Sequence, residues 1–159
     1  MGIWKYIYVF YVIIVWSFIF IYFKPSRLKE LLPVSLLGIL VLFLAEENLV
    51  TLGLYNFPNA MFPIFGIPFF HLIWGAGAAI VVMNFIPQAF SKKMFAILVF
   101  TAVTMLFEYF PENFANAATH MGNYSVTHDA IQDFLSLFIL VTLSEGLFGR
   151  CIKRSRTNS

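Results

Sequence analysis

The chain has 159 residues, of which 60% are hydrophobic and 11% are charged, and its mean hydropathy is +0.84. This composition has too little polar surface for a soluble globular protein and indicates an all-α integral membrane bundle. The net charge of +2 comes from basic residues beside expected helix ends, where topology and anionic lipids explain them without any nucleic-acid site. We expect one bundle over residues 1–152 and a short basic tail at 153–159.

Lysine and arginine are gathered in three short clusters, which long apolar runs separate. Nine of the ten basic residues belong to these clusters, at residues 24–29, 92–93 and 150–156. Loops rich in Lys and Arg remain on the cytoplasmic side of a membrane, because their transfer across a bilayer is unfavourable. The clusters therefore predict five spans, with the N-terminus outside and the C-terminus and its tail in the cytoplasm.

The expected spans are apolar runs long enough to cross a hydrocarbon core of about 30 Å. Four of them cover residues 3–23, 33–53, 69–86 and 95–110, and a fifth ends near Gly149. Pro25 is expected to help end the first span, since proline has no backbone N–H for a continuing helix. Residues 55–68 are rich in proline and glycine, which predicts an outer loop that lies against lipid or re-enters the bundle.

Two of these spans have distinctive faces. Small residues at positions 75–79 of the third span would let a neighbouring helix approach closely. In the fourth span Thr101, Thr104 and Glu108 follow a spacing of three and four residues, so they share one helical face. Glu112 would extend that polar face if the helix continues past Pro111.

Adjacent glutamates, Glu46 and Glu47, lie inside the second expected span. An ionised carboxylate in hydrocarbon costs about 2.5–3.5 kcal/mol on insertion scales, so intramembrane acids are functional candidates by default. Neighbouring helical residues point about 100° apart, so only one glutamate is expected to face the bundle interior. With Glu108 and His71 they form the set of candidate catalytic acid–base residues. The alternative is a structural pair, protonated or hydrogen-bonded to nearby polar groups.

Further histidines and acids follow the fourth span, at His120, His128, Asp129 and Asp133. Their spacing is not an established metal motif, but oxygen and imidazole ligands from different elements can converge on Zn²⁺ or another divalent ion. The sequence contains no His-Glu-x-x-His, Walker loop or Gly-x-Ser-x-Gly motif. The cofactor therefore stays unknown, and these four residues are the candidate metal ligands.

Residues 46–74, EENLVTLGLYNFPNAMFPIFGIPFFHLIW, resemble the core signature of carotenoid-biosynthesis membrane proteins of the carotenoid hydratase type. The adjacent acids also resemble those of heterodimer-type lycopene cyclases. The matching positions are Glu46 or Glu47, Gly53, Tyr55, Pro63, Gly66, Pro68 and Trp74. The chain departs from the patterns at Phe57, where a second Tyr is usual, and at Ala45, which replaces a proline-led run. The resemblance implies acid-catalysed chemistry on a polyene held between helices, without a required organic cofactor.

Three functional hypotheses follow for a protein of the cell membrane. The first is an enzyme or binding protein for an isoprenoid or other lipid, which uses the glutamates for acid–base chemistry. The second is a small transporter or metal-binding protein, and the third is a structural or regulatory subunit with a membrane protein partner. A lipid enzyme should have an apolar channel open to the bilayer beside the acids. A transporter should have polar groups that continue to the inner face.

Overall fold

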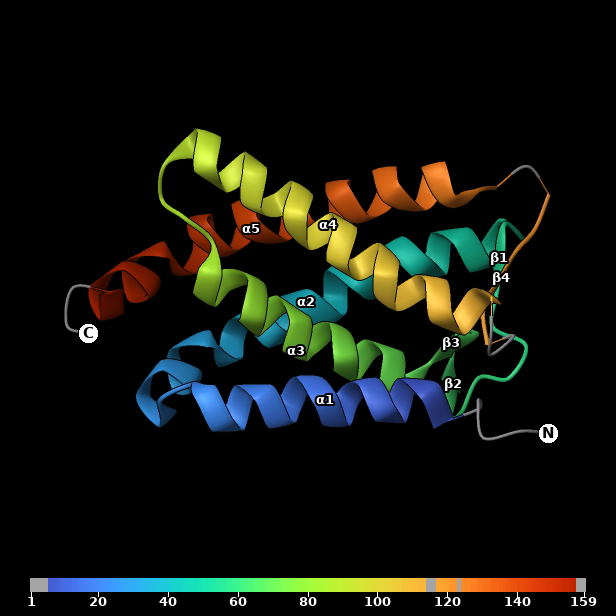
Figure 1. Cartoon of the computed structure of the whole chain (residues 1–159), viewed down its shortest axis with the longest axis horizontal. Helices are drawn as coiled ribbons and strands as arrows, with labels where there is room; N and C mark the ends of the chain where they lie inside the picture. Colours follow the sequence, from blue (N-terminus) through green and yellow to red (C-terminus); the bar gives the residue numbers. More distant parts are fainter. Residues whose placement is uncertain (1–5, 114–116, 123, 157–159) are drawn as a thin grey trace.

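The computed structural model describes residues 6–113, 117–122 and 124–156, with side chains as far as residue 149. Five helices account for most of these residues, as the sequence predicted, and they run side by side in Figure 1. Their bounds are α1 (Ile7–Tyr22), α2 (Pro25–Thr51), α3 (Phe69–Phe85), α4 (Phe90–Asn113) and α5 (Val126–Arg156). Short strands at one end of the bundle are β1 (Tyr55–Asn56), β2 (Pro63–Ile64), β3 (Ile67–Pro68) and β4 (Thr119–His120).

Helices α2, α4 and α5 are long and apolar enough to cross a membrane, α5 over Val126–Gly149. Helices α1 and α3 are apolar but have 16 and 17 residues, so each extends only about 25 Å along its axis. Large apolar side chains project outward from the bundle, including Phe20, Ile21 and Leu106, which are 66%, 73% and 69% exposed. Such an outer surface is suited to hydrocarbon and not to water.

Helix α2 begins at Pro25, eight residues earlier than the predicted start at residue 33. Proline is favoured at the first helical position, because its missing N–H has no partner there and its fixed φ suits a helix. Only Phe23 and Lys24 separate α1 from α2. The first basic cluster therefore lies at the opening of α2 and not in a longer loop, and Pro33 is accommodated within the helix.

Helix α4 starts at Phe90 and continues through Pro111 to Asn113, so it exceeds the predicted span at both ends. Pro111 cannot donate to the carbonyl of Phe107, four residues earlier. The Tyr11 hydroxyl of α1 donates to that carbonyl at 2.9 Å. A neighbouring helix thus satisfies the carbonyl that proline leaves without its usual helical donor. The continued helix keeps Glu112 one turn beyond Glu108.

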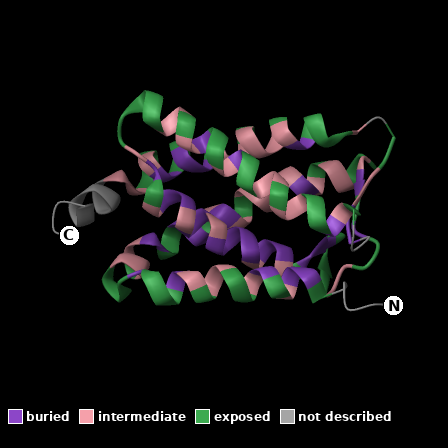
Figure 2. Ribbon diagram, in the orientation of Figure 1, coloured by how far each residue is buried: buried purple, intermediate pink, exposed green. Residues whose placement is uncertain are grey.

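Helix α3 is the core of the bundle, and Figure 2 shows its buried residues facing the neighbouring helices. Ten of its 17 residues are buried, and they include four of the five small residues singled out in the sequence. A Cβ added to Gly38 of α2 would overlap Ala79 of α3, and one added to Gly77 of α3 would press on Val15 of α1. Close approach of α1 and α2 to α3 therefore depends on small residues.

The strands join the two loops at one end of the bundle. β2 and β3 form a tight hairpin, while β1 pairs antiparallel with β4, which places Tyr55 opposite His120. Part of the expected 55–68 loop is thus ordered by backbone pairing, and Phe57 and Ile67 within it are buried. At the other end of the chain, α5 runs through residues 153–156 of the predicted tail, and residues 157–159 lie outside the described part.

We predict that Gly38→Ala destabilises the bundle by about 1–3 kcal/mol, since the added Cβ overpacks the contact with Ala79. The matched control is Gly146→Ala, where an added Cβ meets no atom within 4 Å. That change should be neutral or stabilise by up to about 1 kcal/mol, because alanine has the higher helix propensity. Thermal unfolding of purified protein in detergent, followed by circular dichroism, measures both. Equal shifts for the two variants would contradict the packing argument.

Candidate functional site

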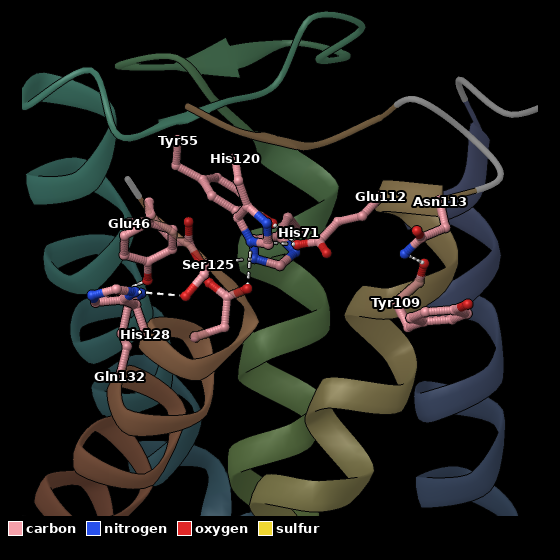
Figure 3. A network of polar contacts seen from close by, with 12 residues as sticks. Glu46, Tyr55, His71, Tyr109, Glu112, Asn113, His120, Ser125, His128 and Gln132 are labelled. Carbon is pink, nitrogen blue, oxygen red and sulfur yellow. Dashed lines mark hydrogen bonds and ion pairs between the residues drawn. The ribbon is translucent and has the colours of Figure 1, made fainter. Parts of the chain in front are cut away.

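Acidic side chains from three helices gather at the end of the bundle that the strands close, and Figure 3 shows two of them, Glu46 and Glu112, on either side of His71 and His120. The acids are Glu46 of α2, Glu108 and Glu112 of α4, and Asp129 and Asp133 of α5, and they lie near enough for their charges to interact. The Lys and Arg side chains that the structure describes belong to the opposite end, at residues 24–29 and 92–93. The described part of this acidic end therefore holds negative charge without a fixed Lys or Arg counter-charge.

The two adjacent glutamates of α2 have different surroundings, as helical geometry predicted. Glu46 points into the bundle and is only 5% exposed. Glu47 is partly exposed and accepts a hydrogen bond of 2.9 Å from Thr51, one turn further along the same helix. Glu46 is therefore the member that shares the interior with the other acids, and Glu47 is satisfied by its own helix.

Glu46 faces His71 of α3 across a narrow gap. The distance from Glu46 Oε1 to His71 Nε2 is 3.6 Å, which is too long for a hydrogen bond. Both side chains are nearly inaccessible, with 6% and 5% of their surface exposed. Among the described residues, Glu46 Oε2 and both ring nitrogens of His71 have no hydrogen-bond partner. The pair is thus a set of buried polar atoms that the protein by itself leaves unsatisfied.

Aromatic rings surround the imidazole of His71. The ring of Trp74 stacks on it with centroids 5.6 Å apart, and the rings of Tyr8 and Phe57 lie at 4.9 and 5.7 Å. His71 and Trp74 are three residues apart in α3, so both side chains lie on the same face of the helix. Ring faces are apolar and electron-rich, so they exclude water and favour positive charge beside the imidazole.

His120, on β4, meets two carboxylates from different helices. Its Nε2 lies 2.5 Å from Asp129 Oδ2 and 3.2 Å from Glu112 Oε1. All three residues offer a ligand atom within 4.8 Å of the other two, which makes them a group that could hold a metal ion. His120 and Asp129 were candidate metal ligands from the sequence. Glu112 was not, although its position one turn after Glu108 could have indicated that it lies near the other acids.

The other two candidate ligands lie elsewhere. His128 is exposed, and its Nδ1 lies 2.9 Å from the Ser125 hydroxyl. Asp133 is one turn beyond Asp129 and faces α4, where its carboxyl lies beside the Glu108 carboxyl. Sequence spacing could not separate these residues, because it does not show which helix each one faces.

Tyrosine hydroxyls lie beside the two acids that contact His120. Tyr55 of β1 donates to Glu112 at 2.7 Å, and the hydroxyl of Tyr124, which lies beside Asp129, donates to Gln132 Oε1 at 2.8 Å. Burial raises the pKa of Tyr55 well above its usual range, and the charges of nearby carboxylates raise it further. Burial and the adjacent Asp129 also raise the pKa of Tyr124. Both phenols therefore stay protonated and act as donors at neutral pH.

An apolar groove of about 720 Å³ lies between α1 and α4, on the outside of the bundle. Its lining is formed by Tyr6, Ile7, Val9, Phe10, Tyr11, Ile13, Ile14, Leu106, Phe107 and Phe110. The ring of Tyr11 is 6.4 Å from that of Trp74, which in turn stacks on His71. Aromatic side chains thus separate the groove from the buried Glu46–His71 pair.

The chain matches no family model, no curated protein and no solved structure. The resemblance to carotenoid-biosynthesis membrane proteins therefore stays a prediction, and the functional argument depends on the geometry of the site.

We predict that Tyr55→Phe destabilises the protein by about 1.5–3 kcal/mol, because a buried carboxylate loses a hydrogen bond from a hydroxyl. The matched control is Tyr22→Phe, since Tyr22 is 71% exposed and its stacking on Phe18 is retained by phenylalanine. The control should change stability by less than about 0.5 kcal/mol. Thermal unfolding in detergent without divalent metal measures both variants, and equal stabilities would refute the role given to the Tyr55 hydroxyl.

Proposed function

We propose that this protein is an integral membrane protein that binds a divalent transition-metal ion between Glu112, His120 and Asp129. The observation that carries the proposal is the convergence of an imidazole nitrogen and two carboxylate oxygens within 4.8 Å of one another. One imidazole and two carboxylates suit Zn²⁺ or Mn²⁺, and the set leaves coordination positions for water or substrate. Of the hypotheses drawn from the sequence, this geometry favours the metal-binding or transport protein.

Metal binding at this centre needs only small movements. Ligand atoms bound to one ion at about 2.1 Å lie roughly 3–3.5 Å apart. The distances from His120 Nε2 to its two acids are 2.5 and 3.2 Å, so the side chains would open by about 1 Å or less. The ion would lie between the imidazole nitrogen and the carboxylate oxygens, in place of the direct contacts that join them now.

Groups around the three ligands support the same function. Metal-binding sites use outer hydrogen bonds to orient the ligands, and the removal of such bonds typically weakens binding 10–100-fold. The Tyr55 hydroxyl donates to Glu112 Oε1, the oxygen that also faces His120 Nε2, and so orients that carboxylate toward the imidazole. The Tyr124 hydroxyl lies beside Asp129 and donates to Gln132 Oε1.

The proposed orientation in the cell membrane places the metal centre on the outer side. The described basic residues lie at the other end of the helices, which the positive-inside rule assigns to the cytoplasm. Two of them join helices there: Arg27 Nε donates to Asn84 Oδ1 at 3.2 Å, and Lys93 Nζ donates to Glu145 Oε2 at 2.5 Å. All five helices then cross the membrane, with the N-terminus outside and the C-terminus inside.

A second candidate function is the binding or acid–base conversion of an isoprenoid or other lipid. The apolar groove between α1 and α4 favours it, because a groove of about 720 Å³ open to the bilayer can hold a lipid chain. Glu46 and His71 would be the acid–base pair, as the resemblance to carotenoid enzymes implies. Aromatic side chains separate the groove from this pair, so a lipid function is supported less well than metal binding.

We predict that His120→Ala and Asp129→Asn each weaken Zn²⁺ binding by about 100-fold or more, because each removes a direct ligand. His128→Ala is the matched control and should bind as tightly as the original protein, since His128 is exposed and bonded to Ser125. Isothermal titration of chelator-treated protein in detergent gives the dissociation constants. Equal constants for the His120 and His128 variants would overturn the proposed centre. A copurified polyene with no metal affinity would favour the second candidate.

For the membrane orientation, single cysteines introduced at Ser91 and Ser125 in a Cys151→Ser background should be labelled from opposite sides. Both serines are exposed, and they lie at opposite ends of the bundle. In intact cells, a membrane-impermeant maleimide should react at position 125 and reach position 91 only after permeabilisation. Reaction of both positions from one side would refute the five-span arrangement.

A further inference from the structure

The Glu46–His71 pair is not part of the proposed metal centre, yet it has the properties of a binding site. Glu46 belongs to α2 and His71 to α3, so neither residue is adjacent in sequence to the three ligands. A buried carboxylate without a hydrogen-bonded partner costs several kcal/mol, and this pair leaves atoms of both side chains unpartnered. Some group that supplies charge or hydrogen bonds is therefore expected between them.

The width of the gap distinguishes between a water molecule and a metal ion. A water that bonds both atoms at about 2.8 Å would need an angle of roughly 80° at its oxygen to span 3.6 Å, well below a tetrahedral angle. An ion bound at about 2.1 Å by both atoms would need an angle of roughly 120°, which is close to common metal geometries. The observed separation therefore fits a directly bound cation better than one bridging water.

The negative charge of the surrounding acids also favours a cation as the group bound between Glu46 and His71. Five carboxyl groups lie together at this end. No Lys or Arg side chain is described near them, so no fixed positive charge of the protein offsets them. A divalent cation at the His120 centre would offset part of this negative charge, and a second cation beside Glu46 would offset more of it.

We propose that Glu46 Oε1 and His71 Nε2 form a second site for a divalent cation, deeper in the bundle than the Glu112–His120–Asp129 centre. The proposal rests on the metal-binding function inferred above and extends it to two ions per chain. Glu46 supplies the negative charge and His71 supplies a neutral nitrogen, while water completes the coordination. The aromatic rings around His71 limit the space and shield the ion from the bilayer.

Equilibrium dialysis against Zn²⁺, with the bound metal counted by mass spectrometry, tests the second site. We expect two ions per chain for the original protein and one for Glu46→Gln, which keeps the shape of the side chain but removes its charge. Glu47→Gln is the matched control, because Glu47 bonds Thr51 on its own helix, and it should still bind two ions. The double variant Glu46→Gln/His120→Ala should bind none.

Two further results keep the outcomes distinct. His71→Gln removes the other ligand and should also leave one ion, which keeps the test decisive if Glu46→Gln does not fold, as judged by thermal unfolding. One ion in the original protein, unchanged by Glu46→Gln and lost in His120→Ala, would overturn the second site and leave the outer centre intact. No bound Zn²⁺ in the original protein would instead overturn the proposed function itself.

Discussion

The arrangement of this bundle depends on how negative charge is held in an apolar interior. Several carboxyl groups share one end of the structure, where desolvation and mutual repulsion both disfavour their ionised forms. Glu112 and Asp129 have protein partners, because both contact His120 and Glu112 also accepts a hydrogen bond from the Tyr55 hydroxyl. Glu46, His71 and Asp133 each leave at least one buried side-chain atom without a hydrogen-bond partner in the described part of this end. This is the physical basis for the two proposed cation sites.

Two backbone features bring the metal ligands together. Pairing of β1 with β4 sets Tyr55 opposite His120, so the donor to Glu112 and the imidazole come from loops that are far apart in sequence. The passage of α4 through Pro111 brings Glu112 to the same place, and it is supported by the Tyr11 hydroxyl on the Phe107 carbonyl. Loss of either feature alone would separate the Glu112 carboxylate from His120. The centre is therefore a consequence of fold geometry and not of a local motif.

The apolar groove and the acidic site are neighbouring but distinct features. Tyr11 belongs to both surroundings, since its ring lines the groove and packs near Trp74, while its hydroxyl supports α4. The ring of Trp74 then covers His71. A lipid chain in the groove would contact aromatic carbon and not the carboxylates. Such a chain would stabilise the wall beside the Glu46–His71 pair, so lipid and cation binding are compatible in one protein.

Composition and periodicity determined the helical class, the number of helices, the polarity of charge along the bundle and the acids worth attention. These follow from local chemistry, because apolar runs and basic clusters act within single segments. The sequence did not determine that Glu46 and not Glu47 faces inward, that α4 survives Pro111, or that His120 joins Glu112 while His128 does not. Those outcomes depend on the rotation of each helix and the register between distant strands. Packing between separate elements decides both the rotation and the register, and the sequence of a single helix does not show either of them.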